Sequence, residues 1–529
     1  MSNEHDLADS TRRMQALRRR LEADGAGSVE LHETHISWVL LAGDFAYKIK
    51  KPVKLPFLDF STLAARRHFC DEELRLNRRL APSLYLEVIG IHDTPGGPAF
   101  GGEGPVVEAA LKMRRFPARA LLSERLAAGL LTADHIDRLA RRIAAFHRDA
   151  AVAPPGSDFG SATLNERATR RVSEAIDAWL RRIEVPGAQA WPALREWLMR
   201  ELQRLAPFWA QRREGGSVRE CHGDLHLANT LVLGDEVTAF DCIEFDPALR
   251  WIDVMNDVAF TVMDLLAHGR ASLAFRFLDG WLQESGEYDG LPSLRFFMVY
   301  RALVRAQVAA LGEAQDLRAA GAPDACDYLR LAVRLADAGE PRLAITHGLP
   351  GSGKTFVSQH WLEQAGAVRV RSDVERKRLA GLAPLASSKD RVPGLYDSAA
   401  TTRTYERLLA VARVVLRSEY PAIVDAAFLR RDERAAFAAL ARETGVPFTI
   451  IDCRAAPEVL HERLVQRQAA GSDASEADVA VLERLALAAE PLDDAERAHA
   501  IVVDDARPAR IAEQCAAWLG SAQAGAVQA

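Results

Sequence analysis

The sequence has few cysteines and no long apolar run. Its 529 residues include six cysteines that lie far apart and form no C-x-x-C pair. Neither a zinc ribbon nor a disulfide framework is therefore expected. No run of about 18 or more apolar residues occurs, so no membrane span is expected. The arginine-rich N-terminus carries acids and lacks an apolar core region, which argues against a targeting peptide. These absences favour a cytoplasmic protein.

A net positive charge is also missing. The chain has 67 Lys and Arg against 73 Asp and Glu, which gives a formal net charge of −6. A domain that binds nucleic acid over its whole surface is usually basic. The composition therefore disfavours nucleic acid as a partner and leaves room for it only in a local groove.

The chain does have two contrasting halves. Two β-rich runs surround Gly43-Asp44, which predicts a hairpin, and most of residues 120–215 have helical periodicity. Beyond residue 342, apolar strands alternate with helices, which predicts a doubly wound parallel sheet. The expected divisions are an N-terminal helix at 1–27, a first domain at 28–336, a linker at 337–342, a second domain at 343–518 and a disordered tail at 519–529.

The segment GLPGSGKT at residues 348–355 matches G-x-x-x-x-G-K-[ST] and lies between a predicted strand and a predicted helix. Glycines let backbone N–H groups surround a phosphate, the lysine reaches the β- and γ-phosphates, and the threonine hydroxyl binds Mg²⁺. An ordinary glycine-rich turn is the alternative. The residues that we expect to bind nucleotide here are Gly348, Gly351, Ser352, Gly353, Lys354, Thr355 and Phe356.

Carboxylates follow two later strands of this half, Asp373 in VRVRSDVERKRL and Asp425 in AIVDAAF. Ligands of an open parallel sheet bind outside the carboxyl ends of its strands. Asp373 could thus accept a proton from an attacking hydroxyl, and Asp425 could assist Mg²⁺ binding. Capping or turn aspartates are the alternative for both.

Arg463 and Arg467 lie one helical turn apart before the segment AAGSDASEA, which we expect to be flexible. Arginines on a mobile lid can neutralise charge on the transferred phosphoryl group. A solvated basic helix face is the alternative.

The second half resembles the small P-loop kinases of the zeta-toxin and polynucleotide-kinase type, often grouped with AAA-family ATPases, over about residues 341–518. In that group the aspartate and arginine of an S-D-x-x-R segment act on the acceptor hydroxyl and its neighbouring phosphate. The resemblance implies a catalytic role for Asp373 and a substrate-binding role for Arg376.

The first half contains H-G-D-x-x-x-x-N, in which Asp224 precedes Asn229 by five residues on a predicted loop. A phosphotransferase loop needs an aspartate to orient and deprotonate the acceptor, and an asparagine for Mg²⁺. Asp241 follows the next hairpin, where kinases keep their metal-binding aspartate.

Upstream, DFAYKIKK is similar to the V-A-I-K strand of kinases. Lys48 would reach the α- and β-phosphates, and Lys50 is the runner-up because it shares the same strand face. Glu73, or less favourably Glu72, would pair with the lysine. Unrelated surface charges are the alternative.

This half resembles the aminoglycoside phosphotransferase and choline kinase branch of the protein-kinase-like fold over about residues 28–335, which implies a two-lobed α+β domain. The resemblance places the hinge at ALKMRRFP, so that backbone near Met113 would meet adenine, and it implies that Asp257, or Asp253, supports the catalytic loop. No G-x-G-x-x-G precedes the lysine strand, so LHETHISW would cover the phosphates. The arginine-rich region 160–215 favours an anionic or neutral acceptor.

Together these patterns predict an α+β protein-kinase-like domain followed by an α/β P-loop domain. We expect a tandem phosphotransferase that uses ATP and Mg²⁺ at two separate sites and acts on hydroxyl groups of small molecules. A nucleotide-sensing protein in which one half gates the other, and a polynucleotide 5′-hydroxyl kinase, are the alternatives.

Overall fold

The computed structural model describes residues 2–55, 58–182, 187–313, 322–337, 339–386, 395–470, 474–475, 477–504 and 507–520, without the side chains of residues 2–5, 26, 313 and 467–470. Contacts divide the chain into two compact units that do not follow sequence order. The first unit contains Met1–Leu131, Asp149–Leu164 and Arg213–Asp257, and the second contains Thr132–Arg148, Asn165–Arg212 and Val258–Ala529. The domain boundaries that we expect from the sequence stay a prediction, and residues 521–529 of the expected tail lie outside the described residues.

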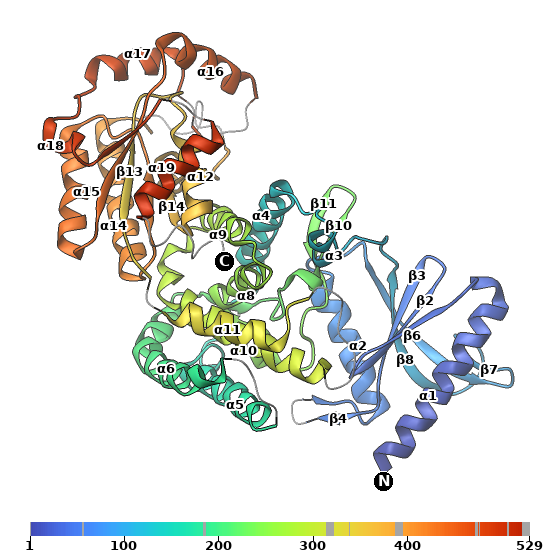
Figure 1. Ribbon diagram of the computed structural model, residues 1–529. Helices are drawn as coiled ribbons and strands as arrows, with labels where there is room; N and C mark the ends of the chain where they lie inside the picture. The colour runs from blue at the N-terminus through green and yellow to red at the C-terminus, as the bar shows by residue number, and fades with distance from the viewer. Residues whose placement is uncertain are drawn as a thin grey trace. The chain divides into compact units, whose positions relative to one another are not determined.

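The first unit begins with helix α1 (Ser2–Leu21), a π-helical turn at Glu22–Ala26 and an antiparallel sheet (Figure 1). The sheet order is β1-β2-β3-β8-β6-β7. Its strands are β1 (Glu30–Glu33), β2 (Ser37–Ala42), β3 (Phe45–Lys50), β6 (Tyr85–Thr94), β7 (Gly97–Phe100) and β8 (Val106–Arg114). Met14 and Leu17 of α1 are buried against Trp38 and Leu40, which explains the apolar stripe of this arginine-rich helix. The predicted hairpin at Gly43 is confirmed, since Gly43 has a φ of 57° between β2 and β3.

Helix α2 (Leu63–Asn77) packs on this sheet beside β8. Its N-terminus is capped by Thr62, whose side chain accepts the backbone N–H of Ala65. The helix thereby places Glu73, which is fully buried, beneath strand β3. A short hairpin of β4 (Lys54–Leu55) and β5 (Leu58–Asp59) precedes it.

The rest of the first unit is built from short elements that hold loops. They are α3 (Leu122–Ala127), β9 (Val218–Glu220), a 3₁₀ turn (Leu227–Asn229), β10 (Thr230–Leu233), β11 (Glu236–Ala239), α7 (Pro247–Arg250) and β12 (Trp251–Asp253). Strands β10 and β11 form an antiparallel hairpin, and β12 pairs with β9. The hairpin brings the segment before β10 and the segment after β11 to the same end.

The second unit contains the helices that continue the first half of the chain. They are α4 (Ala133–Asp149), α5 (Ala162–Leu180), α6 (Trp191–Glu214), most of α8 (Val254–Ala267), α9 (Ala271–Ser285), α10 (Leu291–Glu313) and α11 (Ala325–Ala336), with 3₁₀ turns at Ala188–Ala190 and Glu287–Gly290. Helix α10 packs along α11, and α9 packs against α12 and β14 of the segment that follows.

A parallel sheet with the order β14-β15-β13-β16-β17 completes the second unit, which confirms the predicted parallel fold. Its strands are β13 (Leu343–His347), β14 (Val368–Arg371), β15 (Ala422–Asp425), β16 (Phe448–Cys453) and β17 (Ala500–Val503). The helices between and after them are α12 (Lys354–Ala365), α13 (Ser372–Leu379), α14 (Ser398–Arg417), α15 (Arg431–Thr444), α16 (Pro457–Ala470), α17 (Val479–Ala488), α18 (Asp494–Arg497) and α19 (Pro508–Leu519).

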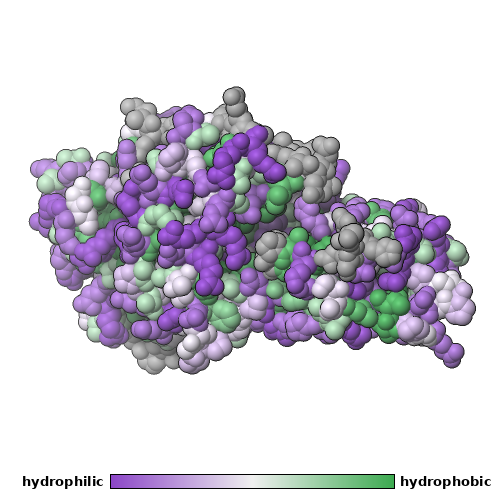
Figure 2. All heavy atoms as spheres, turned by 90° about the horizontal axis from the view of Figure 1, so that it is seen from below, coloured by the Kyte–Doolittle hydropathy of each residue, from purple (hydrophilic) through white to green (hydrophobic). Residues whose placement is uncertain are grey.

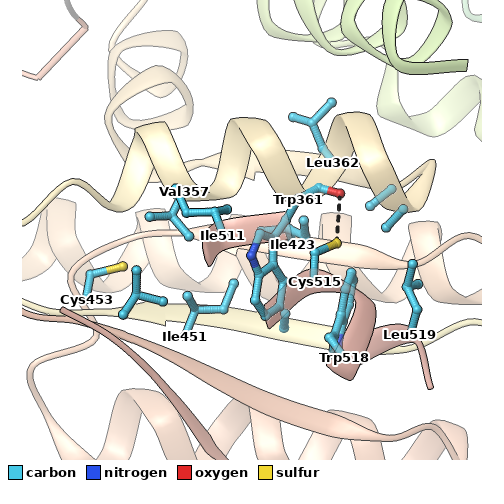
Figure 3. Close-up of a cluster of buried hydrophobic side chains, with 14 residues drawn as sticks. Val357, Trp361, Leu362, Ile423, Ile451, Cys453, Ile511, Cys515, Trp518 and Leu519 are labelled. Atoms are coloured by element: carbon cyan, nitrogen blue, oxygen red, sulfur yellow. Dashed lines mark hydrogen bonds between the residues drawn. The ribbon is translucent and has the colours of Figure 1, made fainter. Parts of the chain in front are cut away.

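Helices α12 and α19 share a hydrophobic core with this sheet (Figure 3). The Trp361 and Trp518 rings stack at 5.1 Å between centroids, and Cys515 Sγ lies 3.8 Å from the Trp361 carbonyl oxygen. Buried aromatic pairs of this kind stabilise a helix against its neighbour beyond the area they bury. The core fixes α12, and with it the glycine-rich loop that precedes the helix.

Within the described ranges, none of the helices is long and apolar enough to cross a membrane. Figure 2 shows one face of the molecule, on which hydrophilic residues predominate and hydrophobic residues occur in separate groups.

Candidate functional sites

In the first unit, Lys48 lies between two carboxylates that come from different elements. Its Nζ is 2.7 Å from Glu73 Oε1 on α2 and 2.6 Å from Asp241 Oδ1 in the segment after β11. Glu72, the second candidate for this pairing, binds Arg75 instead. The structure thus brings together Lys48, Glu73 and Asp241, although Lys48 and Asp241 are 193 positions apart in the sequence.

Lys50 belongs to the same cluster because side chains two positions apart share a strand face. Its Nζ lies 2.7 Å from Glu73 Oε2 and also contacts Glu244. Lys50 is 1% exposed, whereas 15% of the Lys48 side chain is exposed. Lys48 is therefore the lysine that a ligand can reach, and Lys50 balances buried charge.

The cluster shifts the pKa of its members. Burial by itself would raise the pKa of Glu73, but the ammonium groups of Lys48 and Lys50 hold it down, at about 2. Burial opposes charge on Lys48, yet Asp241 and Glu73 raise its pKa well above the ordinary value. Burial raises the pKa of Glu244 despite the nearby lysines. Both lysines and Glu73 are consequently charged at neutral pH.

The loop that carries Asp224 is held from beneath by Asp257. The backbone N–H groups of His222 and Gly223 donate to the Asp257 carboxylate at 3.0 and 2.9 Å, and Asp257 is fully buried. Gly223 has a φ of 86°, and a Cβ there would lie 2.7 Å from the Leu249 carbonyl oxygen, so only glycine fits. Asp253 instead accepts the N–H of Met255. Asp257 is thus the residue in contact with this loop.

Asn229 connects this loop to the hairpin. Its Nδ2 donates to Asp224 Oδ2 at 2.8 Å and to the Asp224 carbonyl oxygen at 3.0 Å. Its own carbonyl oxygen accepts the N–H of Phe240, the residue before Asp241. The side chains of Asp224 and Asp241 are 34% and 40% exposed. The β10–β11 hairpin therefore presents Asp224, Asn229 and Asp241 together at one end.

Met113, whose backbone is expected near adenine, lies on β8 directly opposite Ala46 of β3. The turn expected to cover phosphates is also formed: the Ser37 N–H donates to Thr34 Oγ1 at 3.0 Å, and the two hydroxyl oxygens are 2.9 Å apart. These elements surround Lys48 within the sheet because β3 lies between β2 and β8.

The arginines between residues 160 and 215 are less of a basic surface than the sequence indicates. Several are paired with acidic residues of the same region: Arg170 with Glu166, Arg195 with Asp177 and Arg204 with Glu201. These pairs neutralise part of the positive charge, and the preference for an anionic or neutral acceptor stays a prediction.

In the second unit, the segment between β13 and α12 wraps tightly. Gly348 and Gly351 have φ of 137° and 85°, and a Cβ would lie 2.4 Å from the Cys453 carbonyl oxygen and 2.9 Å from that of Leu460. Gly353, with a φ of 93°, is the N-cap of α12. Lys354 Nζ lies 2.9 Å from the carbonyl oxygens of Gly348 and Leu349. This geometry is that of a phosphate-binding loop.

Beside this loop is a cavity of about 470 Å³ at the carboxyl ends of the strands. Among the predicted residues, those that line it are Gly351, Gly353, Lys354, Thr355, Phe356, Asp373, Arg376, Asp425 and Arg463. Gly348 and Ser352 lie behind the lining, and the buried Ser352 Oγ has no hydrogen-bond partner among the described residues.

Asp373 and Asp425 enter this cavity from neighbouring strands. Asp373 is in the first turn of α13, which follows β14, and Asp425 is the last residue of β15. Asp425 is 4% exposed and lies 3.5 Å from Arg371 Nε and 3.3 Å from Ser358 Oγ. The structure thus brings both aspartates to the glycine-rich loop.

The arginines differ in how they are held. Arg376 is 8% exposed, and its Nη1 donates to the Leu395 carbonyl oxygen and to Thr401 Oγ1, both at 3.2 Å. Arg463 is exposed and donates to the Gly351 carbonyl oxygen at 3.1 Å. The side chain of Arg467, and residues 471–473 and 476 of the expected lid, lie outside the described residues.

Sequence reasoning missed part of the lining of each site. In the first unit it missed Glu244, and around the cavity it missed Arg371, Tyr396, Thr401, Arg430, Glu433 and Arg484. Arg371 could have been found, because it ends the strand before Asp373. The others lie in loops or on helices that carry no motif, so nothing in the sequence marks them.

Comparisons with known proteins match the two halves separately. A family model described as "Phosphotransferase enzyme family" matches residues 58–297, and one described as "AAA domain" matches residues 343–492. Uncharacterized proteins of Mycobacterium tuberculosis and Mycobacterium bovis are 31% identical to the chain over 461 residues, which cover 84% of this chain and 88% of each of theirs. The alignment therefore reaches into both matched regions.

Solved structures are more distant. The Plasmodium vivax ethanolamine kinase aligns with 59% of this chain and 83% of its own, at 11% identity and a TM-score of 0.36. A gluconokinase of Sinorhizobium meliloti aligns with 34% of this chain and 93% of its own, at 21% identity and a TM-score of 0.23.

Proposed function

The chain belongs to the same family as these mycobacterial proteins and joins a kinase-like phosphotransferase domain to an AAA-type P-loop domain; from this premise we propose that it is a tandem phosphotransferase. It transfers the γ-phosphoryl group of ATP to hydroxyl groups of small molecules at two separate sites. The observation that supports this most directly is that each set of phosphate-handling residues lies within one compact unit. Neither site borrows a proposed catalytic residue from the other unit.

At the first site, Asp224 orients the acceptor hydroxyl and takes its proton, and Lys48 holds the α- and β-phosphates. Glu73 fixes the lysine at 2.7 Å. Asn229 and Asp241 would hold Mg²⁺, and their oxygen donors fit a hard cation. Mg²⁺ supplies positive charge that neutralises the phosphoryl group during transfer. Met113 contributes backbone near the adenine.

At the second site, the loop from Gly348 to Thr355 binds the phosphates of ATP, with Lys354 at the β- and γ-phosphates. Its tight glycines and the unpaired Ser352 hydroxyl fit a bound anion. Thr355 and Asp425 would hold Mg²⁺. Asp373, which also lines the cavity, takes the proton of the acceptor hydroxyl.

Positive charge at the second site comes from arginines. Arg376 binds the acceptor next to the hydroxyl that reacts, while Arg463 and Arg467 neutralise the transferred group. The cavity supports this assignment because Arg376 and Arg463 both line it.

The test is transfer of labelled phosphate from ATP by the whole chain to sugars, amino alcohols, aminoglycosides, nucleosides and oligonucleotides. Asp224→Asn should abolish transfer to one class of acceptor, and Lys354→Ala should abolish transfer to another. Loss of a base or a phosphate ligand costs about 10²–10⁴-fold in rate. The double variant should be inactive toward both classes. Equal loss of every activity in both single variants would overturn the proposal of two separate sites.

The oligonucleotide arm of this screen addresses polynucleotide 5′-hydroxyl kinase activity. An enzyme that binds nucleic acid loses affinity steeply with salt, because each phosphate contact releases counterions. Transfer to oligonucleotides that depends on Lys354 and falls steeply between 50 and 200 mM salt, on the order expected for several phosphate contacts, would favour that function.

A further inference from the structure

A buried arginine that belongs to no motif lies behind the P-loop. Arg369 is on β14 and is 2% exposed. Its guanidinium forms a fork with Asp279 of helix α9, from Nη2 to Oδ2 at 2.8 Å and from Nε to Oδ1 at 3.3 Å. Both residues lie in the second unit, and Asp279 is 4% exposed. A paired, fully buried arginine of this kind fixes the position of whatever else it binds.

Arg369 also binds the first turns of α12, the helix that follows the P-loop. Its Nη1 donates to the Thr355 carbonyl oxygen at 3.2 Å and to Ser358 Oγ at 3.1 Å. Ser358 Oγ in turn lies 3.3 Å from Asp425 Oδ2. One guanidinium therefore connects the backbone of Thr355 and, through a single hydroxyl, the carboxylate of Asp425. These are the two residues that the proposed function assigns to Mg²⁺.

The charge that balances Arg369 comes from outside the P-loop segment. Asp279 lies within residues 58–297, which match the phosphotransferase family. Among the residues that the structure describes, Asp279 is the carboxylate that pairs with Arg369. A buried guanidinium without a partner is strongly unfavourable, because its lost hydration is not replaced. The P-loop segment thus relies on α9 for its own internal charge balance.

Other residues on the same face of α9 contact the P-loop segment. Phe275 packs on the hydrophobic core around Trp361, and its ring would lie 2.9 Å from a Cβ at Gly366. Gln283 Oε1 accepts from Arg371 Nη1 at 3.3 Å, and Arg371 is the residue beside Asp425. Since positions 275, 279 and 283 are four apart, they share one side of the helix. The contact is continuous along two turns of α9.

We infer that Asp279 and Arg369 are positioning residues for the P-loop site, so that a helix of the phosphotransferase-family segment is a structural part of the second site. Asp279 orients Arg369, and Arg369 holds the Thr355 backbone and the Ser358 hydroxyl in place for the metal-binding residues. The inference rests on the proposed nucleotide site and adds residues that no motif of either family marks. Neither residue contacts nucleotide.

The experiment measures Mg·ATP binding to the full chain by titration calorimetry, together with the Mg²⁺ concentration needed for half-maximal binding. Lys354→Ala defines the share of binding that belongs to the P-loop site. Asp279→Asn should weaken that share by about tenfold or more and raise the Mg²⁺ requirement. Asp279→Glu, which keeps the charge, should restore most of the affinity. In the Lys354→Ala background, Asp279→Asn should have no further effect.

The matched control is Asp137→Asn. Asp137 forms a similar fork with Arg276 on the same helix, at 2.7 Å to both nitrogens, and Arg276 also binds Glu363 near the C-terminal end of α12, about two turns from Thr355. Asp137→Asn therefore disturbs the contact of α9 with α12 away from the proposed metal-binding residues. It should leave the Lys354-dependent binding unchanged. If Asp137→Asn weakens the Lys354-dependent binding as much as Asp279→Asn does, the inference is overturned, because any disturbance of α9 would then be enough to weaken binding.

A double variant separates positioning from mere stability. Asp279→Leu with Arg369→Met removes both charges, and apolar replacements of a buried pair often keep or increase stability. Thermal stability should therefore recover while the nucleotide affinity remains about tenfold low. Recovery of affinity without Arg369 would overturn the positioning role. If nucleotide binding by the wild-type chain does not depend on Lys354, the proposed function fails as well. If binding depends on Lys354 but Asp279→Asn does not change it, only the inference fails.

Discussion

At the scale of single residues, the two lysines of β3 differ in depth, and the difference separates function from stability. Lys50 balances Glu73 and Glu244, both of which are almost fully buried, whereas Lys48 reaches the more exposed Asp241. Lys48→Met should abolish transfer at the first site and leave the fold largely intact. Lys50→Met should cost about 3–5 kcal/mol of stability, because it takes the ammonium group away from the buried Glu244 and leaves Glu73 with Lys48 alone.

Transfer assays and denaturant unfolding of both variants test this prediction. Arg75→Met serves as a control. Arg75 is on α2, the helix that carries Glu73, and it pairs with Glu72 and Glu220, but its side chain is 49% exposed. If Lys50→Met is as stable as wild type while Lys48→Met is not, the assignment of the two lysines is reversed.

Glu73 gives the first unit a dependence on pH. A carboxyl group whose pKa is lower in the folded state stabilises the fold above its unfolded pKa, here 4.5, and loses that contribution as the pH falls toward about 2. The hydrogen-exchange protection factors of α2 and β3, which correct for the intrinsic exchange rate at each pH, should therefore fall progressively below pH 4.5. In Glu73→Gln this acid-dependent step should be reduced, and an unchanged profile would contradict the prediction.

The pairing of Lys48 with Glu73 could be predicted because a known motif order surrounds it. The double role of Glu73 toward Lys50 could not, since alternation along a strand gives the shared face but not the depth of each side chain. Glu244 follows no strand or motif. Its position depends on how the chain turns after Asp241, whose φ of 64° is unusual for a residue with a side chain.

At the scale of elements, the next prediction concerns Asp257 of α8, which supports the 222–229 loop. Asp257→Asn turns one acceptor into a donor that faces the backbone N–H groups of His222 and Gly223. An unsatisfied buried group costs about 1–3 kcal/mol, so the transfer rate at the first site should fall about 10–100-fold with little change in nucleotide affinity. Steady-state kinetics at varied ATP concentration measure both quantities.

Asp253→Asn is the control for this prediction. Asp253 accepts the N–H of Met255 at the start of the same helix. It should lower the rate far less than Asp257→Asn. A larger effect of Asp253→Asn would make that residue the support of the loop.

Most elements could be predicted where a local signal exists. The hairpin at Gly43 follows from its turn residues, and the parallel sheet follows from apolar strands that alternate with helices. Strand β6 has a weaker local signal, because YLEVIGIHDT contains a glycine and has weak alternation. It is a strand because β8 and β7 pair with it on both sides, which is a long-range effect.

At the scale of the whole molecule, the sequence predicts two self-contained domains, but the compact units divide differently. Helices α9 and α10 of the first half lie in the same unit as the P-loop sheet. Motifs, turn residues and the alternation of strands with helices are local signals that the sequence shows. Contacts such as that of Asp279 with Arg369, 90 residues apart, carry no local signal.

We therefore expect the P-loop segment to be weakened when it is separated. A fragment of residues 339–520 leaves Arg369 without its carboxylate, and its melting temperature should lie about 5–15 °C below that of the same transition in the full chain. Arg369→Met should raise the melting temperature of the fragment, although it impairs the full chain. Calorimetry of the fragment, its variant and the full chain measures these shifts. A fragment as stable as the full chain would contradict the prediction.

The Asp279–Arg369 pair also bears on how such a chain can diverge. A recombination event that exchanged one half for that of a distant relative would bring together an α9 and a β14 with separate histories of substitution. If either side lacked its charge, the hybrid would carry an unbalanced ion in its interior from the first generation. The two halves would then function only as a matched set, and the match would be needed at one face of α9 rather than at the linker between the two matched regions.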